Sequence, residues 1–193
     1  MVVAGQQRLF CAGGFTRFRA DPRILPWNLY SEPGNSGKRT ASLPLVRNVF
    51  AWAREVNPAP PLESGIGAWD LAALNALQIG SSDIATYRDY DYEAWHLRVI
   101  QRLRTTGRPL ACTEYIARPR NSRSATIMPL LKRGNAGAIS WGLVEGKTNT
   151  TYALDRPLAD GSEPVGWFHE VFRRVGTPYR HDETELTKKL NSR

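Results

Sequence analysis

The chain has 193 residues, of which 41% are hydrophobic and 23% are charged, and its formal net charge is +8. A chain of this length and composition can bury a core of its own, so we expect a single domain over residues 1–193. No apolar run approaches the roughly 20 residues that a membrane-spanning helix needs, which argues against an integral membrane protein and a membrane partner.

Residues 1–20 contain Gln6, Gln7 and three arginines, so they do not form the apolar stretch of a signal peptide. We therefore expect an irregular N-terminal segment and, by default, a cytoplasmic location. Cys11 and Cys112 leave two alternatives open, a pair of thiols or one disulfide bridge. The three histidines have no metal-ligand spacing with one another or with the cysteines, so we expect neither a metal nor a cofactor.

The positive charge raises the question of nucleic-acid binding, because a basic patch binds phosphates by releasing their counterions. The arginines are scattered along the chain, from Arg8 to Arg180. The densest clusters, at 102–104 and 118–123, do not interleave with aromatic residues of the kind that stack on bases. We therefore expect no nucleic-acid partner.

From residue 22 onward, short apolar runs alternate with helical patterns, which is typical of repeated βα units with a parallel sheet. The predicted strands are 24–30, 61–66, 84–87, 109–114 and 136–141. The predicted helices are 43–56 with Ser42 as N-cap, 69–77, 92–104, 122–133 and 164–174. Residues 180–193 are highly charged, and we expect them to form a peripheral tail.

Two glutamates follow predicted strands at the point where each strand ends. Glu32 comes after the apolar run 24–30, and Glu114 comes after Pro109 to Thr113. Ionisable residues at strand ends mark catalytic positions in an α/β barrel. Retaining glycosidases need a carboxylic acid and a carboxylate nucleophile about 5 to 5.5 Å apart, so this pair suggests glycoside hydrolysis. The alternative is that both glutamates are ordinary loop residues.

The six tryptophans divide into two groups by their neighbours. Trp27, Trp52, Trp95 and Trp167 stand among apolar residues of predicted strands or helices, which favours packing in the core. Trp69 and Trp141 lie nearer to predicted strand ends and loops. These two are the better candidates for binding substrate by stacking on the face of a sugar ring.

Residues 21–33 run Asp-Pro-Arg-Ile-Leu-Pro-Trp-Asn-Leu-Tyr-Ser-Glu-Pro. They resemble the fourth-strand signature of clan A glycoside hydrolases, the (β/α)8 barrels related to cellulases and β-glycosidases of family five. Residues 138–142 (Ala-Ile-Ser-Trp-Gly) resemble the eighth strand, and 167–170 with 176–179 resemble the C-terminal helix and the tail after it. The likeness covers nearly the whole chain from residue 16 onward.

The resemblance implies a role for each matching residue. Glu32 corresponds to the acid/base at the end of the fourth strand, and Glu114 to the nucleophile at the end of the seventh. Trp141 corresponds to the tryptophan that forms the floor of the sugar subsite. The implied activity is retaining hydrolysis of O-glycosidic bonds in a β-linked oligo- or polysaccharide.

Two positions depart from the family pattern. Ser31 stands where the family has an asparagine that binds the sugar 2-hydroxyl, so one donor is lost, and this interaction normally strengthens in the transition state. In the sixth-strand region, where relatives often carry His-x-Tyr, this chain has Arg88-Asp89-Tyr90. Tyr90 is thus retained, and Arg88 replaces the histidine. We expect Ser31, Arg88 and Tyr90 to line the subsite.

The resemblance also implies a truncated barrel. If residues 24–30 form strand four, the chain supplies about five of the eight βα units of a fold that typically needs about 250 residues. Such a partial TIM barrel exposes a sheet edge, which favours a homo-oligomer. The alternative function is therefore a catalytically inactive remnant that binds carbohydrate, or that persists only as a folded or oligomerising fragment.

Overall fold

The computed structural model describes residues 13–153 and 156–192. They form two compact units. Unit 1 comprises the chain up to Arg88 together with Thr106–Pro109, and unit 2 comprises Asp89–Thr105 and Leu110–Arg193. No helix among the described residues combines the length and hydropathy needed to cross a membrane.

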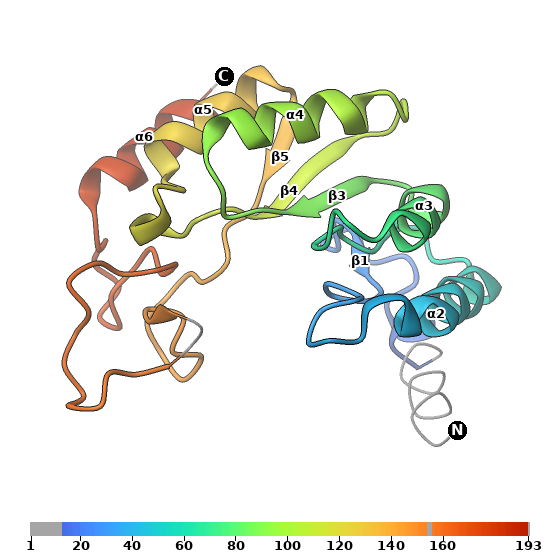
Figure 1. The fold of residues 1–193 in the computed structure, drawn as a ribbon, viewed down its shortest axis with the longest axis horizontal. Coiled ribbons are helices and arrows are strands. Elements are labelled where there is room, and N and C mark those ends of the chain that lie inside the picture. The colour runs from blue at the N-terminus through green and yellow to red at the C-terminus, as the bar shows by residue number, and fades with distance from the viewer. Residues whose placement is uncertain (1–12, 154–155, 193) are drawn as a thin grey trace. The chain divides into compact units, whose positions relative to one another are not determined.

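Strands and helices alternate along the chain (Figure 1). This alternation, with parallel strands, confirms the predicted series of βα units. In chain order the elements are β1 (Trp27–Asn28), the 3₁₀ helix η1 (Arg39–Ser42), α2 (Leu43–Val56), β2 (Leu62–Glu63), α3 (Ala72–Ser81), β3 (Ala85–Arg88), α4 (Glu93–Arg104), β4 (Leu110–Glu114), the 3₁₀ helix η2 (Arg118–Arg120), α5 (Ser124–Arg133), β5 (Ala136–Ala138) and α6 (His181–Asn191).

In unit 1, β1 pairs in parallel with β2, with Trp27 opposite Leu62. A parallel bridge between Ile66 and Tyr87 joins the segment after β2 to β3. Both β1 and β2 are shorter than the predicted strands 24–30 and 61–66. A proline directly precedes each strand and has no N–H to donate to a ladder, so neither strand extends further towards the N-terminus.

The core of unit 1 forms around α2. Its buried residues Val46, Val49, Phe50 and Ala53 recur at helical spacing, as the sequence predicts. Val46, Phe50 and Ala53 belong to a cluster with buried side chains from β2 and α3 and with Phe15. Ser42 occupies the predicted N-cap position, but its hydroxyl donates backwards to the carbonyl oxygen of Arg39 (2.7 Å), because η1 leads directly into α2.

Helix α3 begins three residues later than predicted, because two of its amide side chains bind the loop after β2. Asn75 Nδ2 donates to the carbonyl oxygen of Ala68 (3.0 Å). Gln78 Nε2 donates to the carbonyl oxygen of Gly65 (2.8 Å). These bonds satisfy backbone oxygens that have no helical partner, so the loop runs on past Trp69 before the helix begins.

In unit 2, β4 pairs in parallel with β5, with Leu110 opposite Ala136 and Cys112 opposite Ala138. Helices α4, α5 and α6 lie along one face of these strands (Figure 1). Helix α4 buries His96, Val99, Ile100 and Leu103, which recur at helical spacing. Helix α5 continues through Pro129, and β5 ends before the predicted position 141.

The C-terminal part of unit 2 differs from the prediction. The helix predicted for 164–174 is absent, and the last helix is α6, at His181–Asn191. The backbone N–H groups of Phe168 and Val171 instead donate to the carbonyl oxygens of Thr151 (2.8 Å) and Leu143 (3.2 Å). The charged tail is not peripheral, because α6 packs against α5 and buries Glu183.

Candidate functional site

Glu114 is the last residue of β4. Along this strand the buried positions are Leu110, Cys112 and Glu114, and the two positions between them are half-buried. This alternation places the carboxylate on the same side of the strand as its buried apolar neighbours. Only 9% of Glu114 is exposed, so its carboxylate stands in a largely desolvated environment.

Tyr90 binds this carboxylate directly. Its hydroxyl donates to Glu114 Oε2 at 2.5 Å. The backbone N–H of Asp89 donates to the carbonyl oxygen of Glu114 at 3.0 Å. The segment that begins unit 2 is therefore attached to the end of β4 by a main-chain and a side-chain hydrogen bond, which together orient the carboxylate.

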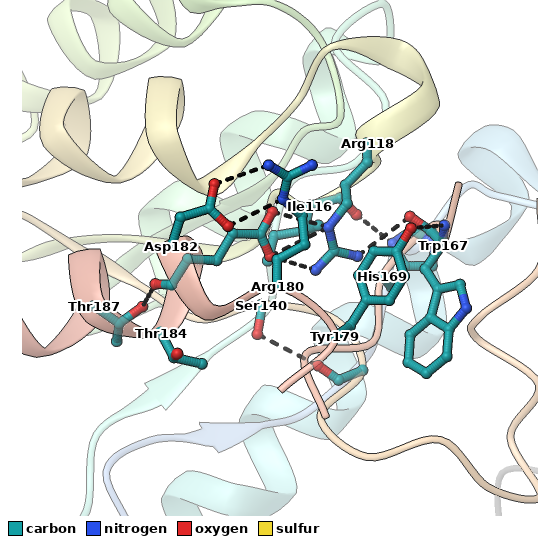
Figure 2. Close-up of polar contacts among 12 residues, drawn as sticks. Ile116, Arg118, Ser140, Trp167, His169, Tyr179, Arg180, Asp182, Thr184 and Thr187 are labelled. Atoms are coloured by element: carbon teal, nitrogen blue, oxygen red, sulfur yellow. Dashed lines mark hydrogen bonds and ion pairs between the residues drawn. The ribbon is translucent and has the colours of Figure 1, made fainter. Parts of the chain in front are cut away.

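The imidazole of His169 packs against the Tyr90 ring. The centroids of the two rings are 5.1 Å apart, with an angle of 52° between their planes. His169 is buried, and its Nδ1 contacts the carbonyl oxygen of Ile116 (Figure 2). No function was predicted for His169, because nothing in the local pattern links it to Ile116, which is 53 positions earlier in the chain.

Trp141 follows β5 and is 43% exposed. The carboxyl ends of parallel strands meet at one edge of a sheet, so Trp141 and Glu114 belong to the same edge of unit 2. The next residue, Gly142, has a φ of +81° and packs on the buried carboxylate of Glu170. Glu170 is a second residue that sequence reasoning missed.

Glu32 lies in unit 1, in the loop after β1. Its φ is +44°, and its Oε2 accepts a hydrogen bond from Asn35 Nδ2 at 2.7 Å. The half-buried carboxylate lines a cavity of about 280 Å³ formed by the loop 32–37 with Arg39, Gly67 and Ala68. A Cβ at Gly67 would come within 3.0 Å of Glu32 Oε1, so the glycine makes room for this carboxylate. Ser31 is exposed.

Arg88 belongs to a buried polar cluster in unit 1. Its Nη1 donates to the carbonyl oxygen of Gly65 at 3.3 Å, and 5% of the residue is exposed. The cluster includes Glu63, which accepts a hydrogen bond from the hydroxyl of Thr86. Burial raises the pKa of Glu63, and hydrogen bonds from Thr86 and Asn28 with the charge of Arg88 oppose that rise. Sequence reasoning missed Glu63, although an acid inside a predicted strand was a visible signal.

Trp69 is half-buried in unit 1. Its ring meets that of Tyr87 edge to face, with 6.4 Å between centroids and an angle of 61°. Cys112 is buried, and its thiol donates to the carbonyl oxygen of Glu114 at 3.3 Å. Cys11 lies outside the described residues, so the alternative of a bridge between the cysteines stays a prediction. In the described part of the chain, no three His, Cys, Asp or Glu side chains gather as a metal site.

The predicted site residues thus divide between the units. Unit 2 brings together Tyr90 and Glu114 and places Trp141 at the same sheet edge. Unit 1 contains Glu32 and the remaining predicted residues, Ser31, Trp69 and Arg88. Because Glu32 and Glu114 belong to different units, the separation of their carboxyl groups stays a prediction.

No protein-family model matches this sequence. No curated protein matches it either. Solved structures do resemble it. A β-glucuronidase of Faecalibacterium prausnitzii superposes with a TM-score of 0.71 at 13% identity, over 97% of this chain and 34% of that one. A glycosylated endo-β-1,4-xylanase of glycoside hydrolase family 10 from Gloeophyllum trabeum superposes with a TM-score of 0.62 at 15% identity, over 95% of this chain and 65% of that one.

This chain therefore spans about a third of the length of the glucuronidase and just under two thirds of that of the xylanase. At these identities the likeness concerns the fold. It confirms the predicted class, an α/β chain with parallel strands that forms part of a TIM barrel. Both structural neighbours are glycoside hydrolases, so the fold is glycosidase-like.

Proposed function

We propose that this chain carries the catalytic carboxylates of a retaining β-glycosidase of the family-five type, with Glu114 as nucleophile and Glu32 as acid/base. The observation that carries the proposal is the hydrogen bond from the Tyr90 hydroxyl to Glu114 Oε2, at the end of a barrel strand. A largely buried carboxylate held at a strand end by a neutral donor suits a nucleophile that must keep one orientation.

In the proposed reaction, a carboxylate oxygen of Glu114 attacks the anomeric carbon while the protonated Glu32 gives its proton to the leaving oxygen. The glycosidic bond breaks, and a covalent glycosyl ester forms on Glu114. Glu32, now ionised, takes a proton from water, and the resulting hydroxide displaces the ester with a second inversion. The anomeric configuration of the substrate is therefore retained in the product.

Trp141 is proposed as the stacking platform for the sugar at this site. Its exposed ring follows β5 at the sheet edge to which Glu114 belongs. Ring faces of tryptophan bind the C–H side of pyranoses, so a β-linked oligo- or polysaccharide is the proposed substrate class. We propose that Ser31, Trp69 and Arg88 of unit 1 contribute the rest of the subsite, as the resemblance implies.

The test uses a panel of aryl β-glycosides with a chromogenic aglycone. We expect turnover by the intact chain and loss of at least about 1,000-fold in kcat for Glu114→Ala, because the covalent step is lost. Glu185→Ala, which removes an exposed carboxylate of α6, is the control and should retain activity. A Glu114→Ala variant as active as the control would contradict the proposal.

Added azide, an external nucleophile, distinguishes the role of nucleophile from that of acid/base. In Glu114→Ala it can replace the nucleophile and should give the α-glycosyl azide after one inversion. In Glu32→Ala it should attack the glycosyl ester and give the β-glycosyl azide. NMR of the anomeric proton identifies the product. The same anomer from both variants would rule out the assigned roles.

The second candidate function is a carbohydrate-binding protein without turnover. It is favoured by the exposed ring of Trp141 combined with Ser31 in place of the asparagine that binds the sugar 2-hydroxyl. A folded sample that binds β-linked oligosaccharides, loses binding in Trp141→Ala and shows no turnover would support this function over the enzyme.

A further inference from the structure

The segment 167–172 crosses unit 2 without forming a helix or a named strand. Its main chain donates hydrogen bonds to two parts of the loop after Trp141. The N–H groups of Phe168 and His169 donate to the carbonyl oxygens of Thr151 (2.8 Å) and Thr150 (3.2 Å). Phe172 N–H donates to the carbonyl oxygen of Leu143 (2.8 Å). The segment is therefore fixed to the loop that follows Trp141.

His169 connects this segment to the Tyr90–Glu114 pair. The carbonyl oxygen of Ile116 can only accept a hydrogen bond, so the contact with His169 Nδ1 requires the proton on that nitrogen (Figure 2). Ile116 lies two residues after Glu114 on the same segment. The ring of Tyr90, whose hydroxyl binds Glu114, rests against the imidazole that Ile116 holds.

Glu170 connects the same segment to the turn that carries Trp141. It is fully buried, and its Oε1 accepts hydrogen bonds from the hydroxyls of Thr150 and Thr148, the latter at 3.3 Å. Among the described residues, its Oε2 has no hydrogen-bond partner. A Cβ at Gly142 would come within 2.9 Å of Oε2 and 3.0 Å of Thr150 Oγ1, so the residue after Trp141 packs on this carboxylate.

From these contacts we infer that 167–172 positions both parts of the unit 2 site. His169 is a positioning residue for Tyr90 and Glu114, and Glu170 is a positioning residue for the Trp141–Gly142 turn. Neither residue is assigned a contact with the sugar. The inference rests on the proposed function and adds two residues to it, with separate effects. His169 governs the chemical step, and Glu170 governs sugar affinity.

The first experiment replaces His169. In His169→Ala we expect kcat to fall about 10- to 100-fold with KM within about threefold, because a displacement near 1 Å of the reacting carboxylate has an effect of this size. His169→Asn keeps an N–H near the position of Nδ1 and should recover part of kcat. His181→Ala, at the exposed start of α6, is the control. Equal kcat in His169→Ala and the control would overturn the role of His169.

The second experiment compares two glycines of one loop. Gly142→Ala forces a Cβ against Glu170 and should raise KM or the sugar dissociation constant about 3- to 10-fold, which corresponds to the weakening of one stacking contact. Gly161→Ala is the matched control, since Gly161 also has a positive φ (+69°) but a Cβ there would meet nothing within 4 Å among the described residues. Glu170→Ala should weaken sugar binding similarly. Unchanged sugar affinity in both Gly142→Ala and Glu170→Ala would overturn the role of Glu170.

A readout without turnover separates this inference from the proposed function. Should the intact chain show no glycosidase activity, the proposed enzyme is wrong, but the imidazole signals in ¹H–¹⁵N spectra still report the His169 contact. We expect the signal that disappears in His169→Asn to belong to a ring that carries a proton at Nδ1. A ring protonated at Nε2 alone would overturn the inference, because it has no donor for Ile116.

Discussion

At the scale of single residues, burial sets the charge of two side chains in unit 2. Asp89 is 6% exposed, and loss of hydration raises its pKa to about 6, although the backbone N–H of Asp91 donates to its Oδ1 at 2.8 Å. His96 is fully buried, and loss of hydration lowers its pKa to about 4, although the nearby charge of Asp91 opposes this shift. Both groups are therefore neutral in the folded protein near pH 5.

These two shifts make opposite contributions to the pH dependence of stability. Between pH 3.8 and about 6 the folded state holds a proton on Asp89 that the unfolded state releases, so this contribution falls as pH rises. Between about 4 and 6.5 the unfolded state holds a proton on His96 that the folded state lacks, so this contribution rises with pH. The two nearly cancel from pH 4 to 6.

Asp89→Asn removes the first contribution and keeps the acceptor for Asp91. We therefore expect the difference in free energy of unfolding, variant minus intact chain, to increase as pH rises from 4 to 6. The increase should be up to about 1.4 kcal/mol per pH unit. Urea unfolding at several pH values measures it. His96→Asn should show the opposite relative slope, and parallel pH profiles for all three proteins would contradict the assignment.

At the scale of elements, a buried ion pair fastens α6 to the segment after β4. Arg118 Nη2 lies 2.6 Å from Glu183 Oε2, with both side chains less than a tenth exposed, and Arg118 Nη1 donates to the carbonyl oxygen of Trp167 at 3.2 Å (Figure 2). The Arg118 guanidinium also lies over the ring of Tyr179, 5.1 Å from its centroid. Helix α6 is thus part of the packed unit, despite its charged sequence.

Glu183→Gln should lower the free energy of unfolding by about 3 to 5 kcal/mol, because it leaves the Arg118 guanidinium buried without its counter-charge. Glu185→Gln is the matched control on the same helix. Its pair with Lys188 is about two thirds or more exposed and therefore screened by solvent, so we expect no measurable change in the free energy of unfolding. Chemical unfolding of the two variants measures the difference, and equal stability would show that the pair does not hold α6.

The segment 164–174 shows where a local sequence pattern did not predict the secondary structure. Residues 164–174 have apolar spacing compatible with a helix, yet the chain there is bound through its backbone to the loop after Trp141. Long-range hydrogen bonds from Phe168 and Phe172 took the place of helical ones. Helix α6 forms instead where Asp182 and Glu183 occupy the first turn and Lys188 and Lys189 the last, an arrangement that favours the helix dipole.

At the scale of the whole molecule, ion pairs with carboxylates offset part of the positive charge of the arginines among the described residues. Several arginines pair with carboxylates, as Arg54 does with Asp83 (2.7 Å) and Arg39 with Asp70 (2.8 Å). We therefore expect no saturable binding of single- or double-stranded DNA at 0.15 M salt up to about 100 μM protein. Fluorescence anisotropy with a labelled oligonucleotide measures this. Saturation at micromolar protein would contradict the expectation.

The sequence by itself determined the βα alternation, the bounds of α2 and the end of α4, and it placed Glu114 at the end of a strand. These features follow from local causes, namely apolar spacing, strand-like runs and breaks at proline or glycine. The fold class could be predicted as well, because the alternation of strand-like runs with helical patterns is itself a local feature of the sequence. The sequence also singled out Tyr90, which the structure joins to Glu114.

Only the tertiary structure decided the start of α3, the position of the last helix and the burial of Glu63, His169 and Glu170. Each depends on contacts between residues far apart in the sequence, as with His169 and Ile116, which are 53 positions apart. Apolar periodicity encodes which face of an element is buried. It does not encode which polar group across the fold will satisfy a buried side chain, because that partner is fixed only when the elements pack.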